Sequence, residues 1–355
     1  MMPTSETPTM QGPACPLPLS HDTQIVMGHG SGGRMTSELI QRVFLPRFSN
    51  PTLLAGNDFA ALQAKGGQLA ISTDSHIVNP LFFPGGDIGK LAICGTVNDV
   101  AMSGATPVSL TAGFILEEGL LISNLEKIAD SMQAAAAEAG VQIVAGDTKV
   151  VEKGKADGIF INTTGVGWVP QGRVIGGEQA KPGDAVLLSG TLGDHGMAVL
   201  TARGDLGFEA NIQSDVAPLN HLIAAVLKAA PHTHVLRDPT RGGLATTLNE
   251  IACQSNVSIW LDEAIIPVSQ PVKAACEMLG FDPLYIANEG KVIVIVPESE
   301  ADKALGAMKT SPYGKNAVKI GTVKEDEPGR VLLQTLIGGT RILDTLAGEI
   351  LPRIC

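Results

Sequence analysis

Hydrophobic positions along the chain follow two patterns. Short apolar runs bounded by Gly, Pro or Asp are typical of strands, and apolar residues three or four apart are typical of helices. In the first half they predict strands at 67–73, 108–116, 141–145 and 159–168 and helices at 87–103 and 123–139. In the second half they predict strands at 185–189, 257–261, 291–297 and 320–322 and helices at 195–203, 219–230, 242–254, 272–279 and 301–308. Regular β–α–β spacing is missing, which favours an α+β fold over a doubly wound one.

Two further features refine this pattern. Ser123 is predicted to cap the second helix, with Glu126 completing a capping box. A polar stretch rich in Gly and Pro, around residues 169–183, predicts a boundary between two domains. We therefore expect an N-terminal domain over 25–169, a C-terminal α+β domain over 170–347, and a flexible tail over 348–355. Residues 1–24, rich in Pro, Ser and Thr, are predicted to be a disordered extension.

Composition excludes several classes of protein. Hydrophobic residues make up 44% of the 355 residues, enough for a sizeable core. The formal net charge is −11, aromatic residues are only 4%, and no Lys/Arg cluster is present, so binding to nucleic acid is disfavoured. No apolar run reaches the length of a membrane span. The five cysteines form neither a CxxC pair nor a zinc-type spacing, which favours a reducing, cytoplasmic location.

Two glycine-rich matches carry little weight. The GxGxxG match at 28–33 lacks the β–α–β context and the later acidic residue of a dinucleotide site. The GGDIGK segment at 85–90 is one residue short of a P-loop, and Leu91 stands where a P-loop has Ser or Thr.

Aspartates carry the strongest chemical signal in the first half. Each of five follows a predicted strand or lies in a Gly-rich or apolar context: Asp58, Asp74, Asp87, Asp99 and Asp147. One such Asp is most often a turn or cap residue. Five together point to hard oxygen ligands for Mg²⁺, which usually takes one or two carboxylates plus substrate phosphates.

Other polar residues in the first half add to this signal. Asn98 and Asp99 stand between apolar residues, where a buried polar group needs a partner such as a metal–phosphate ligand. Lys149 is either a cation for a phosphate or carbonyl group, or a surface lysine at a strand end.

Three motifs and the last residue stand out in the second half. The motifs are SGTLGDHG at 189–196, RDPTRGG at 237–243 and NEG at 288–290. Glycine turns let backbone approach a ligand, arginine pairs suit phosphate or carboxylate, and Glu289 is a candidate base. Each could instead be ordinary loop or cap chemistry. Cys355 is either incidental or a group carrier on a flexible end.

Taken together, the motifs resemble one family. HGSGG, STDS, GGDIGKLAICGTVNDVAMSGA, AGDTKVV, GTLGDHG, RDPTRGG, ANEGK and terminal PRIC are similar, in order and spacing, to the HypE hydrogenase maturation proteins. The resemblance spans about residues 26–355. It places the chain in the superfamily of aminoimidazole ribonucleotide synthetase, selenophosphate synthetase and thiamine-monophosphate kinase. It implies a two-domain α+β fold whose N-terminal domains pair into a homodimer with a shared β-barrel.

The resemblance also implies a site. ATP and Mg²⁺ would lie in a cleft lined by carboxylates. Metal binding carries over to Asp58, Asp74, Asp99 and Asp147, and nucleotide binding to these residues with Lys90, Asn98 and Thr148. The implied catalytic residues are Cys355 as covalent carrier, Lys149 to polarise a carbamoyl group, and Glu289 to take nitrogen protons.

The implied reaction is an ATP-dependent dehydration. HypF would load a carbamoyl group on Cys355, dehydration would give a thiocyanate, and the cyanide would pass to iron on a HypC–HypD complex for the [NiFe]-hydrogenase centre. Two alternatives remain open: a sister enzyme that phosphorylates a free small molecule, and a non-enzymatic ATP-bound scaffold.

Overall fold

The structure is a computed structural model. It describes residues 21–31, 33–54, 60, 62–63, 66–204, 210–345, 351 and 353–355. Most of the predicted N-terminal extension, the candidate ligand Asp58 and half of the predicted tail (348–350 and 352) lie outside the described residues. Within the described part of the chain, no helix is long and apolar enough to cross a membrane.

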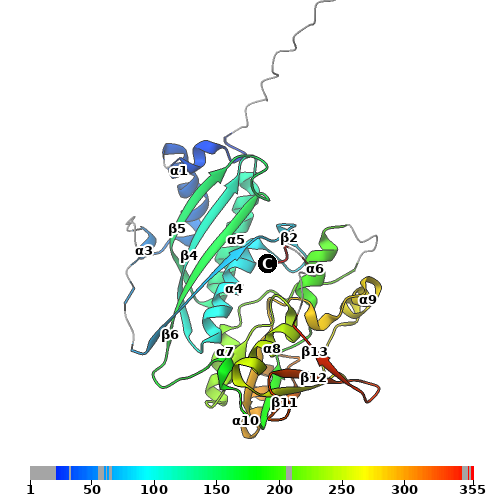
Figure 1. The fold of residues 1–355 in the computed structure, drawn as a ribbon. Coiled ribbons are helices and arrows are strands. Elements are labelled where there is room, and N and C mark those ends of the chain that lie inside the picture. Colours follow the sequence, from blue (N-terminus) through cyan, green and yellow to red (C-terminus); the bar gives the residue numbers. More distant parts are fainter. Residues whose placement is uncertain are drawn as a thin grey trace, which may run out of the picture.

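The first domain is a four-stranded sheet with helices on one face (Figure 1). Its strand order is β1 (Gln68–His76), β6 (Ile159–Val169), β4 (Thr106–Glu117), β5 (Gln142–Val151). Only β4 and β5 are parallel neighbours. Helices α4 (Ile88–Met102) and α5 (Ile122–Ala139) lie against the sheet. The short elements are η1 (Met27–Gly30), α1 (Arg34–Leu39), the π-helical turn η2 (Ile40–Phe44), α2 (Leu45–Phe48), α3 (Pro51–Leu54), β2 (Phe82–Phe83) and β3 (Gly86–Asp87).

The second domain is built on a seven-stranded sheet. Its order is β13 (Thr340–Leu343), β12 (Arg330–Gln334), β9 (Ser258–Asp262), β11 (Val318–Lys324), β7 (Asp184–Leu188), β10 (Ile293–Pro297), β8 (Val235–Arg237). Neighbours are antiparallel except β12 and β9. The helices are α6 (Asp194–Ala202), α7 (Asn220–Ala229), α8 (Gly243–Ser255), α9 (Gln270–Leu279) and α10 (Glu298–Thr310), with short turns η3 (Gly177–Gln179) and η4 (Pro283–Tyr285). The predicted α+β class is confirmed.

Each helix and strand predicted from the pattern is present, but the capping prediction is wrong. Helix α5 begins at Ile122, one residue before Ser123, and the residue before it makes no side-chain cap bond. Ile122 is buried, and its N–H donates to the Thr23 carbonyl at 2.9 Å, so backbone replaces the predicted cap. Glu126 accepts from Arg42 at 3.0 Å instead. Strands β8, β12 and β13 and the helices between 34 and 54 were not predicted.

Helix α4 belongs to the cores of both domains. Its apolar residues from Ile88 to Val97 pack in the core that lies under the first sheet. Ala101 and Met102, at its end, pack with buried residues of the second domain such as Leu187. Burial of apolar surface on both sides of one helix therefore fixes the two domains to each other.

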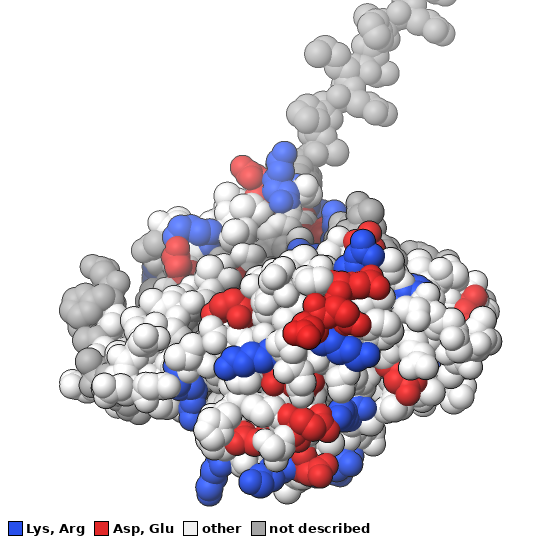
Figure 2. All heavy atoms as spheres, turned by 60° about the horizontal axis from the view of Figure 1, so that its bottom comes forward, with Lys and Arg blue, Asp and Glu red and all other residues white. Residues whose placement is uncertain are grey.

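The opposite face of the first sheet is uncovered. Leu69, Ile71 and Ile115 lie on it and are 49%, 63% and 42% exposed. Among the described residues of a single chain the sheet is open, because β1 and β5 form its two edges. Figure 2 shows a different face, where acidic and basic side chains are intermixed.

Asn98 joins α4 to the second domain. Its side chain is buried, with Nδ2 donating to the Ala217 carbonyl at 3.1 Å and Oδ1 accepting from the Leu219 N–H at 2.8 Å. The sequence suggested a ligand as partner for this buried amide. The partners in the structure are backbone groups.

Replacing Asn98 with Ala is therefore expected to destabilise the fold. Two buried backbone groups would lose their partner, which should lower the free energy of unfolding by about 2–3 kcal/mol. Urea titration followed by circular dichroism measures this. Asn316→Ala, at an exposed position, is the control and should change stability by less than about 0.5 kcal/mol. Equal midpoints for the two variants would contradict the assigned role.

Candidate active site

The C-terminal residues are docked between the two domains (Figure 1). Leu351 and Ile354 are buried in the core cluster that also holds α4. The Ile77 N–H, just after β1, donates to the Cys355 carbonyl at 3.3 Å. The Arg241 guanidinium lies 3.2 Å from Cys355 Sγ. The described end of the chain therefore places its thiol at a defined point in the cleft.

The docked thiol is protonated. Burial raises the pKa of Cys355 to about 12, and the neighbouring Glu289 adds to the rise. Arg241 opposes the shift without cancelling it. Because the thiolate is the nucleophilic form of cysteine, Cys355 is a weak nucleophile in this position.

Hydrogen bonds to its backbone fix the position of Glu289 in the cleft. It lies between η4 and β10 and is 5% exposed. The Asp215 carboxylate accepts from the N–H groups of Glu289 at 3.1 Å and Gly290 at 3.2 Å. A Cβ at position 290 would lie 1.7 Å from the Asp215 carbonyl oxygen, so this close approach requires glycine. The same carboxylate accepts from Lys291 Nζ at 2.9 Å.

Glu289 shares its surroundings with other carboxylates. Burial raises the pKa of Glu289 well above its ordinary value, and Asp238 and Asp74 raise it further. Burial, then Asp99, raises the pKa of Asp238 to about 7. Burial also raises the pKa of Asp99, although Ser72 Oγ donates to it at 2.8 Å. These acids interact because like charges in one low-dielectric site oppose each other's ionisation.

The point where Asp74 and Glu289 converge lies over helix α4. A Cβ at Gly95 would lie 3.4 Å from Asp74 Oδ2 and 4.0 Å from Glu289 Oε2. Among the described residues, no three His, Cys, Asp or Glu side chains form a complete metal site. Mg²⁺ needs only one or two carboxylates when substrate phosphates supply other ligands. Asp74 and Asp99 fit that requirement, whereas Asp58 lies outside the described residues.

Asp147, Thr148 and Lys149 are not brought to this cluster within one chain. They lie on β5, the opposite edge of the sheet from β1. The strand register links Asp74 to Gly146 through three interstrand spacings, roughly 14 Å. Lys149 Nζ donates to Asp147 Oδ1 at 2.8 Å and holds the pKa of that carboxyl below its ordinary value.

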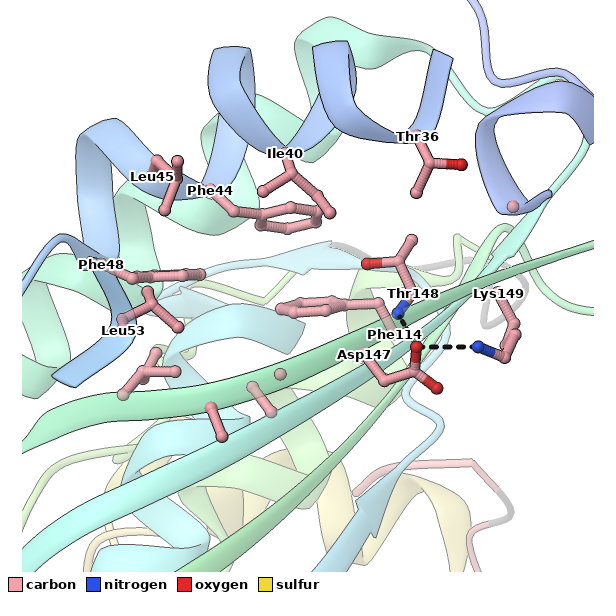
Figure 3. Close-up of a pocket in the computed structure, with 15 residues that line it drawn as sticks. Thr36, Ile40, Phe44, Leu45, Phe48, Leu53, Phe114, Asp147, Thr148 and Lys149 are labelled. Carbon is pink, nitrogen blue, oxygen red and sulfur yellow. Dashed lines mark hydrogen bonds and ion pairs between the residues drawn. The ribbon is translucent and has the colours of Figure 1, made fainter. Parts of the chain in front are cut away.

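Beside that ion pair is an apolar cavity of about 190 Å³ between η2, α2 and strands β4 and β5 (Figure 3). Phe44, Phe48 and Phe114 line it, and the rings of Phe44 and Phe114 stack at 4.6 Å. Thr148 points into it, whereas the Asp147–Lys149 pair lies at its edge. The cavity is thus separate from the cluster of carboxylates formed by Asp74, Asp99, Asp238 and Glu289.

Lys90 lines a different, polar hollow of about 260 Å³, together with Lys291 and Lys315. Its Nζ donates to the Gly85 carbonyl at 3.3 Å. Asp87, another of the five aspartates, caps helix α4: its Oδ1 accepts from the N–H groups of Gly89 and Lys90. For Asp87, the ordinary cap interpretation is therefore the one in the structure.

Sequence reasoning missed four residues of the site individually. His195, Asp238 and Arg241 lie in motifs that were singled out. His195 and Asp238 were given no role, and Arg241 was expected, as one of an arginine pair, to bind phosphate or carboxylate rather than to contact Cys355. Asp215 lies in a segment without any motif and had no signal in a single sequence.

Comparisons with known proteins agree with this architecture. The AIR synthase related protein family, N-terminal domain, matches residues 56–169, and its C-terminal domain matches 181–334. The two-domain fold is that of this class of protein. Within it, relatives 56% identical over more than nine-tenths of the chain show that it belongs to the HypE family of carbamoyl dehydratases, which are enzymes of hydrogenase maturation.

Three relatives illustrate the match. The chain is 56% identical to carbamoyl dehydratase HypE of Cupriavidus necator over 333 residues, 94% of this chain and 95% of that protein. It superimposes on a crystal structure of HypE in complex with ATP with a TM-score of 0.90, at 50% identity, covering 93% of this chain and 99% of that one. It superimposes on a chain of a HypE–HypF complex with a TM-score of 0.76, at 53% identity, covering 87% of this chain and 99% of that one.

Replacing Asp215 with Asn should destabilise the folded protein. Burial opposes ionisation of Asp215, but the charge and hydrogen bond of Lys291 hold its pKa below the ordinary value. A carboxyl whose pKa is lowered in the folded state stabilises the folded protein at pH values above its ordinary pKa. That contribution is lost as the pH falls through the folded-state pKa. Breaking the buried pair is expected to lower the free energy of unfolding by on the order of 3 kcal/mol at pH 7. The difference between wild type and variant should become smaller below about pH 4.

Urea midpoints across this pH range test the expectation. Asp302→Asn, on the exposed side of α10, serves as the matched control and should show no pH-dependent difference. A constant difference between wild type and Asp215→Asn from pH 7 to pH 3 would show that the charge of Asp215 is not what stabilises the site.

Proposed function

We propose that this chain uses ATP to dehydrate a carbamoyl group carried on its own Cys355, giving a thiocyanate. The observation that supports this most directly is the docking of Cys355 in the cleft, where burial and then the buried carboxyl of Glu289 raise the pKa of its thiol. A related HypE has been solved in complex with ATP, which supports the same nucleotide for this chain.

The chemistry proceeds in two parts. The carbamoyl oxygen attacks the γ-phosphorus of ATP, forming a C–O–P linkage as the bond to ADP breaks. The nitrogen then loses its protons, a C≡N bond forms, and the C–O bond breaks with phosphate as the leaving group. The net change is loss of one water from the S-carbamoyl group, with ATP converted to ADP and phosphate.

Glu289 is the proposed base for the nitrogen protons. Its raised pKa makes the ionised carboxylate a stronger base than an exposed glutamate. Asp215 fixes its backbone, so the carboxyl stays near the docked sulfur. Bound Mg²⁺ would neutralise charge on the transferring phosphoryl group, with Asp74, Asp99, Asp58 and Asp147 as the proposed ligands.

Lys90, Asn98 and Thr148 are the further residues proposed at the nucleotide, and Lys149 is proposed to polarise the carbamoyl group. In one chain, Lys149 lies across the sheet from β1, where Cys355 is docked. Its role therefore requires a second chain or a change of tail position, and the proposed roles of Asp147 and Thr148, on the same strand, require a second chain beside Asp74.

We further propose that the tail leaves the cleft to be loaded. The docked thiol is protonated, whereas carbamoylation needs a nucleophilic sulfur. HypF is the proposed carbamoyl donor, supported by the known HypE–HypF complex of a related chain. A HypC–HypD complex is the proposed acceptor of the cyanide for the iron of the [NiFe]-hydrogenase centre.

The uncovered face of the first sheet is the proposed homodimer surface. Exposed apolar side chains on this face would be buried if two sheets paired into a shared β-barrel. The edge strands β1 and β5 would be the places where such a barrel closes.

The dehydration is tested by the mass of the C-terminal peptide. After incubation with HypF, carbamoyl phosphate and ATP–Mg²⁺, we expect a carbamoyl increment on Cys355 that then falls by one water. Glu289→Gln should still be carbamoylated, but its dehydration should be slower by on the order of 10²–10⁴-fold, as expected for loss of a general base.

Cys355→Ser is the control, because a serine cannot form the thiocyanate. An unmodified tail in the presence of active HypF would refute the proposal and favour an enzyme acting on a free small molecule. A carbamoylated tail that never loses water would favour the scaffold alternative.

Ile71→Asp should convert the dimer to a monomer, because it puts a charge into the middle of the proposed sheet interface. Light scattering after size exclusion measures this. Ile337→Asp is the matched control: Ile337 is 95% exposed at the β12–β13 turn, away from that sheet. Loss of the dimer in both variants, or in neither, would contradict the proposed interface.

A further inference from the structure

The buried side chain of His195 is hydrogen-bonded to the end of the chain. His195, at the start of α6, is fully buried. Its Nε2 lies 2.6 Å from the Ile354 carbonyl oxygen and its Nδ1 lies 2.8 Å from Ser214 Oγ. A carbonyl oxygen can only accept, so Nε2 carries the proton and Nδ1 accepts from the Ser214 hydroxyl. The Val216 N–H donates to Ser214 Oγ at 3.1 Å, which leaves the hydroxyl proton for the ring.

The ring of His195 has little freedom to move. It packs edge-on against Phe83, with ring centroids 5.4 Å apart and planes at 85°. Burial also lowers its pKa, so the ring is neutral and keeps one donor and one acceptor. By donating to Nδ1, Ser214 stabilises the tautomer that carries its proton on Nε2, whereas the other tautomer would present a lone pair to the Ile354 carbonyl.

The docked tail carries a local conformational cost. Arg353 has φ of 55°, a left-handed conformation that residues other than glycine rarely adopt. Its carbonyl accepts from the Asn79 N–H at 3.1 Å and from Arg203 at 2.9 Å, and its guanidinium pairs with Asp157 at 2.6 Å. Contacts on both sides of Arg353 thus offset the strain, so losing one of them shifts the balance towards release.

We propose that His195 is a positioning residue that keeps Cys355 docked in the cleft, with Ser214 fixing the tautomer it needs. The inference rests on the proposed function, in which the tail alternates between docked and released positions. Ser214 is followed directly by Asp215, which pins the Glu289 backbone. One short segment therefore sets the position of the thiol and of the base relative to each other.

The test measures how fast Cys355 reacts with iodoacetamide in the full-length protein, read by peptide mass. His195→Phe keeps an aromatic ring against Phe83 but removes both hydrogen bonds. We expect Cys355 to be alkylated roughly tenfold faster in this variant, because loss of a buried hydrogen bond increases the released fraction. Cys253, which is exposed, is the internal control and should react at the wild-type rate. Cys94, which is fully buried, reports any loss of the fold.

Two further variants make the result decisive. His195→Gln places an amide donor near the position of Nε2 and should return the Cys355 rate towards wild type. Ser214→Ala removes the tautomer control and should raise the rate severalfold. An unchanged Cys355 rate in folded His195→Phe overturns the proposal. If Cys94 reacts in His195→Phe, that variant has lost its fold and Ser214→Ala becomes the test. A wild-type rate of Cys355 alkylation in Ser214→Ala would then overturn the proposal.

The reaction supplies an independent readout. With HypF, carbamoyl phosphate and ATP–Mg²⁺, His195→Phe should be loaded at least as fast as wild type but dehydrated more slowly. A purely structural role would slow both steps together. The alkylation readout needs neither HypF nor ATP, so its failure is distinguishable from failure of the proposed dehydratase activity.

Discussion

The buried carboxylate of Asp215 is the interaction on which the site depends. A carboxylate in low dielectric is costly unless it is paired and hydrogen-bonded, and Asp215 obtains both from Lys291 and from two backbone N–H groups. Those same bonds fix the loop that carries Glu289. The bonds that offset the cost of burying Asp215 therefore also fix the geometry of the site.

A second constraint is the gathering of several buried carboxyls in one site. Burial and then the neighbouring carboxyls raise the pKa of Glu289 and of Asp238, and burial raises that of Asp99 despite the hydrogen bond from Ser72. The same environment keeps the docked Cys355 neutral. In the proposed reaction the carbamoylated sulfur has no proton to lose, so a loaded tail would return to this environment without a charge being buried. The cleft is in this sense better suited to the modified chain end than to the thiolate.

The sequence predicted the fold class and much of the candidate site, and the failures have physical causes. The helix 88–102 was predictable because its apolar residues and its Asp87 cap are local signals. Glu289 and Cys355 were found through motifs, and the structure places them together. The distance between Asp74 and Asp147 was not predictable, because the order of strands in a sheet is set by long-range packing. The role of Asp215 was hidden for a similar reason: its partners lie more than 70 positions later in the chain.

The packing of α4 has a consequence for how the molecule comes apart. The same helix completes the apolar core under the first sheet and, through Ala101 and Met102, part of the core of the second domain. Neither domain can lose its structure without exposing apolar surface of the other. Two family domains along the sequence thus form a single cooperative unit, and a calorimetric scan should record one melting transition where the domain count alone suggests two.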